Sequence, residues 1–266
     1  MDLELSGKRA IVTGGGSGIG FAIASELSRE GVKVAIVGRR EDVLAPAAKR
    51  ISAETGNVVL PVVADTGVDS TVRNMVDVVV AEFGGVDILV NVASENPAQP
   101  GGLTYEHATD EAFTRQLNVK VIGYLRTARA VAPYFINQGW GRIINISGVG
   151  ARKTYSVINS VRNSGVTALT KNLADELGPH GVNANVLYPG HTMSEQFQER
   201  LEREAADAGV SFDDYIASID TQNAIGRFVK PEEVGWVAAF LASPKSVTIS
   251  GESITVGGGL LGTISY

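Results

Sequence analysis

The stretch that decides the fold is Ala10-Ile11-Val12-Thr13-Gly14-Gly15-Gly16-Ser17-Gly18-Ile19-Gly20. An apolar run leads into a cluster of glycines, and the chain then continues into the helical pattern of residues 19–27. This order predicts a buried strand, a tight turn and a helix whose first turn points at a ligand. Free N–H groups at a helix start bind phosphate, and glycines let the backbone come close to a pyrophosphate. The context favours a dinucleotide site over a plain turn.

Composition limits the classes of protein that the chain can belong to. It has 266 residues, of which 44% are hydrophobic, enough for a substantial core. The 23 basic and 29 acidic residues give a formal net charge of −6 without a basic run, so we expect no nucleic-acid partner. Cysteine is absent, and no signal-peptide pattern or long apolar run is present. We therefore expect a cytoplasmic protein with no membrane partner.

Strand and helix patterns alternate along the chain, which is typical of right-handed βαβ units and an open parallel sheet. The expected strands are residues 10–12, 32–37, 58–63, 86–90, 142–147, 182–188 and 253–256. The expected helices are residues 21–30, 42–55, 68–83, 110–132, 156–177 and 231–241, and the long helix from residue 110 is predicted to be interrupted near Pro133. No linker or repeat divides the chain, so residues 1–266 are predicted to form a single domain.

Two segments outside this alternation are candidates for substrate contact. Residues 94–104 contain two prolines and two glycines, which predicts a loop at the ligand edge of the sheet. Residues 194–220 are charged and mostly helical in pattern, and we expect them to form a substrate-binding lid.

Several spaced motifs together resemble the short-chain dehydrogenase/reductase family along nearly the whole chain. The motifs are the turn at residues 13–20, Asp65, residues 91–94, 173–178, 185–190, 226–233 and 249–252. The resemblance implies an α/β fold with a doubly wound, Rossmann-like parallel sheet of about seven strands and helices on both faces. It also implies an oxidoreductase acting on a small-molecule substrate, and a homo-oligomer, commonly a tetramer.

The same resemblance assigns a set of residues to the dinucleotide. The predicted cofactor-binding residues are Gly14, Gly16, Ser17, Gly18, Ile19, Gly20, Arg39, Arg40, Asp65, Thr66, Asn91, Ala93, Pro189, Gly190, Thr192 and Ser194. The loop after the second strand reads the adenosine ribose, and here it carries Arg39 and Arg40 in place of an acidic residue. Two guanidinium groups suit a 2′-phosphate, so NADP(H) is favoured over NAD(H). Ser17 counts slightly against this preference, because relatives that prefer NADP often carry a basic residue there.

The catalytic half of the site departs from the family pattern. A tyrosine phenol normally handles the proton on the substrate oxygen, and a lysine one helical turn later lowers its pKa. Here those two positions are occupied by Asn159 and Asn163, neither of which can donate a proton. Gly148 stands at the usual serine position, and the asparagine position falls on Lys120, or on Asn118 if the alignment slips by two residues. The usual carbonyl mechanism is therefore not expected.

Nearby residues offer a replacement set. Ser147, Tyr155 and Lys120 all fall at the carboxyl edge of the predicted sheet, and Lys120 could lower the pKa of the Tyr155 phenol. Arg152, Lys153 and Arg162 add positive charge nearby, which we interpret as solvated surface charge.

Three functions remain open from the sequence. The first is an NADP-dependent oxidoreductase with an atypical site that reduces a carbonyl or a conjugated C=C bond. The second is a cofactor-binding pseudoenzyme, and the third is non-redox elimination chemistry on the same scaffold. No metal site is expected, because His191 has no second histidine or carboxylate cluster beside it.

Overall fold

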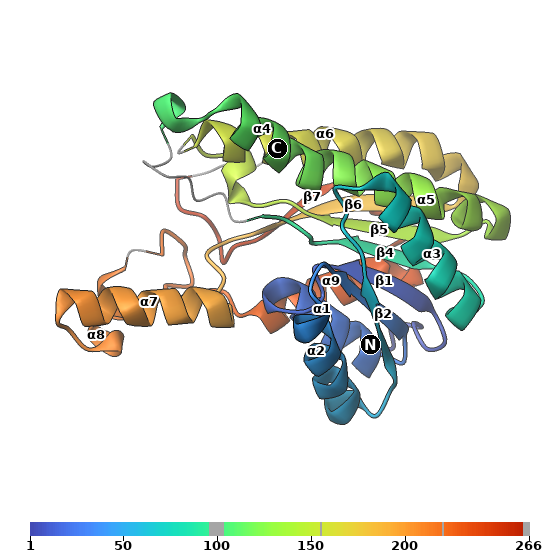
Figure 1. The fold of residues 1–266 in the computed structure, drawn as a ribbon, viewed down its shortest axis with the longest axis horizontal. Coiled ribbons are helices and arrows are strands. Elements are labelled where there is room, and N and C mark those ends of the chain that lie inside the picture. Colours follow the sequence, from blue (N-terminus) through green and yellow to red (C-terminus); the bar gives the residue numbers. More distant parts are fainter. Residues whose placement is uncertain (96–103, 155, 220, 263–266) are drawn as a thin grey trace.

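The strands of the computed structural model form one parallel sheet in the order β3-β2-β1-β4-β5-β6-β7 (Figure 1). The structure describes residues 1–95, 104–154, 156–219 and 221–262. The strands are β1 (Arg9–Thr13), β2 (Lys33–Gly38), β3 (Val59–Val63), β4 (Ile88–Asn91), β5 (Gly141–Ile146), β6 (Val182–Pro189) and β7 (Ser253–Val256). The strand order reverses between β1 and β4, and in open α/β sheets the crevice at such a reversal is where ligands bind.

Helices cover both faces of this sheet (Figure 1). One face carries α1 (Gly18–Arg29), α2 (Glu41–Thr55) and α9 (Pro231–Ala242). The other face carries α3 (Asp69–Phe83), α4 (Asp110–Leu117), α5 (Gly123–Gln138) and α6 (Val157–Leu177). The doubly wound single-domain fold is thus confirmed.

Two apolar layers explain why the strands read as continuous hydrophobic runs. Alternate residues of each strand point to opposite faces. In β1, Val12 packs into the layer under α1, α2 and α9, whereas Ile11 packs into the layer under α3, α5 and α6. Both residues are fully buried, so the strand is apolar on both faces at these positions.

The predicted interruption near Pro133 is wrong, because α5 continues through Pro133 to Gln138. Proline removes one backbone donor, but Val131 and Phe135 on either side are buried in the core and hold the helix together. The irregularity lies earlier, where residues Asn118–Ile122 form a short π-helix between α4 and α5. Such insertions frequently occur at functional sites because they redirect side chains.

The helix pair α7 (Glu195–Ala208) and α8 (Phe212–Ser218) projects from the end of the molecule at which the strands terminate (Figure 1). These helices fall within the segment 194–220 predicted to be helical. Of the predicted loop 94–104, residues 96–103 lie outside the described residues. Among the described helices, none is long and apolar enough to cross a membrane.

Candidate active site

The turn between β1 and α1 is shaped for close backbone approach. Gly14 has φ +69°, and a Cβ atom there would lie 3.0 Å from the backbone nitrogen of Ala93. A Cβ atom on Gly20 would lie 2.1 Å from the carbonyl oxygen of Gly14. The turn therefore accepts only glycine at both positions, and the first turn of α1 begins at Gly18 with its N–H groups directed away from the sheet.

A cavity of about 350 Å³ lies against this turn at the carboxyl ends of β1, β2 and β4. Most of the predicted cofactor residues line it: Gly14, Ser17, Gly18, Ile19, Gly20, Arg39, Asp65, Thr66, Ala93, Thr192 and Ser194. The structure thus brings together residues from five separate sequence segments into one concave site. Its position at the strand reversal and its glycine-rich wall fit a dinucleotide.

Five predicted cofactor residues do not line this cavity: Gly16, Arg40, Asn91, Pro189 and Gly190. Asn91 is fully buried and ties the sheet to α5, because its amide donates to Asn145 Oδ1 and its Oδ1 accepts from Thr127 Oγ1. Arg40 is exposed at the start of α2. Of the two adjacent arginines, the structure therefore places only Arg39 at the cavity.

The start of α7 lies directly opposite the phosphate turn. Gln196 Nε2 donates to Ser17 Oγ at 3.4 Å, and Ser194 caps α7 by accepting from the backbone N–H of Phe197. A Cβ atom on Gly18 would lie 3.5 Å from Ser194 Cβ. The beginnings of α1 and α7 thus lie close to one another at the cavity, and the start of a helix favours the binding of an anion.

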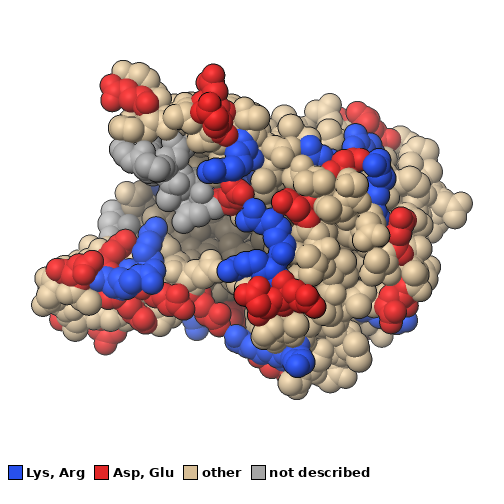
Figure 2. All heavy atoms as spheres, in the orientation of Figure 1, with Lys and Arg blue, Asp and Glu red and all other residues tan. Residues whose placement is uncertain are grey.

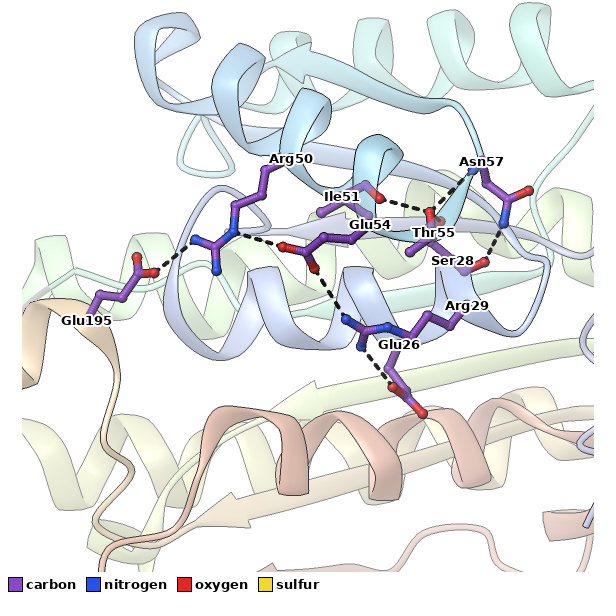
Figure 3. A network of polar contacts seen from close by, with 9 residues as sticks. All are labelled: Glu26, Ser28, Arg29, Arg50, Ile51, Glu54, Thr55, Asn57 and Glu195. Carbon is purple, nitrogen blue, oxygen red and sulfur yellow. Dashed lines mark hydrogen bonds and ion pairs between the residues drawn. The ribbon is translucent and has the colours of Figure 1, made fainter.

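Arg50 of α2 fixes the start of α7 from outside (Figure 3). Its Nη1 donates to Glu195 Oε1 at 2.9 Å, and its Nε donates to Glu54 Oε1 at 3.0 Å. Arg29 of α1 joins the other Glu54 oxygen at 3.2 Å, so a chain of ion pairs runs from α1 through α2 to α7.

Lys and Arg side chains border the hollow seen in the space-filling view (Figure 2). Arg39 Nη1 donates to Glu95 Oε1 at 3.1 Å, and Arg115 of α4 lies 2.9 Å from the other carboxylate oxygen, Oε2. Glu95 also lines the cavity. A single carboxylate is therefore shared by two guanidinium groups at the cofactor site.

Lys120, and not Asn118, lies beside Ser147. Lys120 Nζ donates to the backbone oxygen of Ser147 at 3.0 Å, and the Lys120 side chain is only 4% exposed. Asn118 points toward the loop after β3, where it donates to Gly67 O and accepts from Arg126 Nη2. Burial, and secondarily the positive charge of Arg162, lower the pKa of Lys120 well below its usual value.

The two asparagines share one buried face of α6. Asn159 and Asn163 are one turn apart, and the Oδ1 atom of each has no hydrogen-bond partner among the described residues. Ser147 Oγ donates to the backbone oxygen of Asn163 at 3.0 Å, so the predicted serine contacts this helix. Each of these two buried oxygens is able to accept a hydrogen bond from a group that carries N–H or O–H.

Tyr155, the third member of the predicted replacement set, lies outside the described residues. Tyr124 is the phenol that the structure describes near Lys120, and its hydroxyl donates to Ile146 O. Burial raises the pKa of Tyr124, so this side chain is not suited to release a proton.

The interpretation of Arg162 as solvated surface charge is wrong. Arg162 is 5% exposed, and its Nη1 donates to Glu95 O at 3.1 Å and also contacts Gln116 Oε1. The hydrophobic periodicity of α6 is weak, so the sequence does not indicate whether position 162 lies on the inner or the outer face of the helix. Lys153, in contrast, is partly exposed and donates to Gln222 Oε1.

The described residues contain no cluster of histidine and acidic side chains that could hold a metal ion. His191 lies on the surface, with its ring centroid 6.4 Å from that of Phe228.

A family model described as enoyl-(acyl carrier protein) reductase matches residues 14–261. The chain belongs to the short-chain dehydrogenase/reductase family. It is 36% identical over 251 residues to the short-chain reductase protein NovJ of Streptomyces niveus, and the alignment covers 94% of this chain and 92% of NovJ. It is 32% identical to the peroxisomal 2,4-dienoyl-CoA reductase of Danio rerio over 96% of this chain and 82% of that protein.

A solved short-chain reductase has a closely similar structure. L-sorbose reductase from Gluconobacter frateurii, complexed with NADPH and L-sorbose, aligns with a TM-score of 0.92 and 31% identity, over 99% of this chain and all of that one. The relatives are oxidoreductases, which supports an enzyme of the short-chain reductase type and a nicotinamide dinucleotide as its cofactor.

Sequence reasoning missed two residues of the site in this short-chain reductase. Glu95 and Gln196 both line the cavity, but neither belongs to a motif that marks a cofactor contact. Glu95 follows the partial family motif at residues 91–94, and Gln196 follows the predicted phosphate contact Ser194. The signal available in the sequence was that each of the two residues lies close to a predicted motif or contact residue.

Proposed function

We propose that this short-chain reductase uses NADP(H) to reduce a carbonyl or a conjugated C=C bond of a small molecule. The observation that carries the proposal is Arg39 on the wall of the cavity that also contains the glycine turn. The residue directly after β2 is Arg39 and not an acidic residue, and a guanidinium can pair with a phosphate through two parallel N–H···O bonds. The structurally similar L-sorbose reductase was solved with NADPH.

The cofactor would supply the hydride, and the chain would supply binding, orientation and the proton. Gly14 and Gly20 let the pyrophosphate reach the first turn of α1, while Ser194 and Gln196 close the site from α7. Asn159 and Asn163 then offer amide oxygens to hydroxyl groups of the cofactor or substrate.

Lys120 is the group that we assign to proton transfer. Burial lowers the pKa of the Lys120 amine, so it holds its proton less tightly than an exposed lysine does, whereas the amides of Asn159 and Asn163 cannot donate a proton at useful pH. The Lys120 Nζ atom is held at the Ser147 carbonyl, and the neighbouring residue Val119 lines the cavity. A conjugated C=C bond needs mainly cationic or hydrogen-bonding support at a remote carbonyl oxygen, which favours this reaction class.

The proposal is tested with the purified protein. NADPH and NADH are titrated by fluorescence, and ketones, enones and alcohols are then screened for change in nicotinamide absorbance. We expect NADPH to bind more tightly than NADH and enones to be reduced. In Lys120→Met, NADPH binding is retained and turnover falls about 100-fold or more, the typical contribution of general acid catalysis.

A cofactor-binding pseudoenzyme is the second candidate. It is favoured by the concurrent replacement of the usual tyrosine and lysine by Asn159 and Asn163. NADPH binding without turnover across all three substrate classes would support it. The double variant Asn159→Tyr with Asn163→Lys separates the readings further: if only the acid–base pair is missing, this variant gains carbonyl reductase activity. Failure to gain activity would mean that the substrate pocket has changed as well.

A further inference from the structure

Glu95 holds an unusual position for a carboxylate in a site for a polyanionic cofactor. It follows β4 by four residues, lines the cavity and has a side chain that is 18% exposed. One of its oxygens pairs with Arg39 at 3.1 Å and the other with Arg115 at 2.9 Å. Its backbone oxygen accepts a hydrogen bond from Arg162, so both ends of the residue are held in place.

The Arg39–Glu95 pair spans the site from one strand end to another. Arg39 follows β2 and Glu95 follows β4, and β1 lies between these strands in the sheet. The glycine turn that follows β1 therefore lies between the two partners, and all three elements line the same cavity. The ion pair crosses the region in which the adenosine half of a dinucleotide belongs.

We propose that Glu95 sets the cofactor preference by competing, as an internal anion, with the 2′-phosphate of NADP(H) for Arg39. The inference rests on the proposed use of NADP(H). A 2′-phosphate and the Glu95 carboxylate seek the same planar guanidinium donors, so binding of the phosphate displaces one contact of Glu95. The second contact, to Arg115, keeps Glu95 paired during the exchange, so its charge is not stranded.

NAD(H) carries no 2′-phosphate and leaves the Arg39–Glu95 pair intact. Glu95 therefore lowers the affinity for NADP(H) selectively, by occupying Arg39. Removing the charge of Glu95 raises the preference for NADP(H) over NAD(H).

The test measures dissociation constants for NADPH and NADH with the wild-type protein, Glu95→Gln, Arg39→Ala and the double variant. Glu95→Gln is expected to bind NADPH about three- to fivefold more tightly, the range of a partly exposed ion pair, and NADH within about twofold of the wild type. The gain disappears in the Arg39→Ala background, because the competition needs Arg39.

Asp69→Asn provides a matched control. Asp69 is also a carboxylate shared by two arginines, Arg73 and Arg129, each at 2.7 Å, but it lies on α3 and does not line the cavity. Asp69→Asn removes the same charge and the same kind of contact as Glu95→Gln. We expect it to leave the dissociation constants for NADPH and NADH unchanged. Thermal unfolding of each variant checks that it is folded.

Two results would overturn the inference. The first is that Glu95→Gln leaves the affinities for NADPH and NADH unchanged or changes both by the same factor. The second is that the gain in NADPH affinity persists in the Arg39→Ala background. Failure of the proposed function gives a different result. In that case Arg39→Ala leaves the ratio of the dissociation constants for NADPH and NADH unchanged. The double-variant cycle therefore distinguishes the two failures.

Discussion

Lys120 is a buried cation with no carboxylate partner among the described residues, and it shares its surroundings with Arg162. Removing such a charge from water costs free energy unless the group becomes neutral, and this is why its pKa falls. Among the described residues, Lys120 donates one hydrogen bond, to Ser147 O. We therefore expect the fold to gain stability when Lys120 is replaced by an apolar side chain of similar size.

Lys120→Met should therefore stabilise the folded protein while impairing the reaction. We expect a gain of about 0.5–2 kcal/mol in the free energy of unfolding at pH 7. The unfolded chain holds the Lys120 proton up to its ordinary pKa and the folded chain releases it earlier, so wild-type stability rises with pH between the two values. The gain from the substitution should shrink as pH rises, as measured by urea unfolding at pH 7 and 9. A variant less stable than wild type at pH 7 would contradict this account.

At the scale of elements, the beginnings of three helices meet around the phosphate turn. The starts of α1, α7 and α9 line a second hollow behind that turn, together with Arg50 and Arg227. The start of α7 is held by the contact between Arg50 and Glu195, and the start of α9 by the contact between Arg227 and Glu233. Polar contacts at helix ends therefore support this region in addition to the packed core.

The start of α9 carries a pH-dependent contribution to stability. Glu233 accepts from Arg227 and from the backbone N–H of Lys230, and these bonds lower its pKa to about 2. This contribution is complete above the ordinary pKa of glutamate and is lost as pH falls from about 4.5 to 2. We expect Glu233→Gln to cost about 1 kcal/mol at pH 7 and much less at pH 3, measured by chemical unfolding. An equal cost at both pH values would refute the assignment.

The contact between Arg50 and Glu195 should limit the motion of α7. Both side chains are largely exposed, so the pair adds little to global stability but can hold one helix end. We expect Arg50→Gln to speed proteolysis within residues 195–219 about twofold or more, with less than about 0.5 kcal/mol lost from global unfolding. Arg200→Gln, which removes a pair within α7 to Glu204, is the control. Equal cleavage rates in the two variants would exclude a role for Arg50 in holding α7.

At the scale of the whole molecule, apolar side chains are left exposed on α5 and α6. Val157 and Val161 lie one turn apart on α6, with 44% and 45% exposure, and Ile122 and Leu125 are exposed at the start of α5. Exposed apolar patches on paired helices are typical of association surfaces. We expect these helices to pack against a second copy of the chain in the predicted homo-oligomer.

Val161→Glu tests that association. A charge in the centre of an apolar interface should shift the protein to a smaller assembly without unfolding the protomer, because the side chain lies outside the core. Light scattering coupled to size-exclusion chromatography gives the mass, and circular dichroism checks the fold. Val210→Glu, at a similarly exposed valine after α7, is the control. An unchanged mass for Val161→Glu would place the interface elsewhere.

The sequence by itself determined the alternating strands and helices, the parallel sheet and the phosphate turn. These depend on local signals, namely apolar runs of strand length and glycines that no other residue can replace at close backbone approach. The resemblance to the family also predicts Asn159 and Asn163 at the positions of the usual acid–base pair, and their helical spacing of four predicts that both lie on one face.

Only the tertiary structure decided which charges meet. Arg39 and Glu95 are 56 residues apart and Arg50 and Glu195 are 145 apart, so no local pattern could join them. The same holds for the buried side of Arg162 and for Lys120, whose orientation follows from the π-helical turn that carries it. Long-range contacts and burial determine where these side chains lie and what they contact. They therefore also determine the pKa of Lys120 and the proposed competition at Arg39.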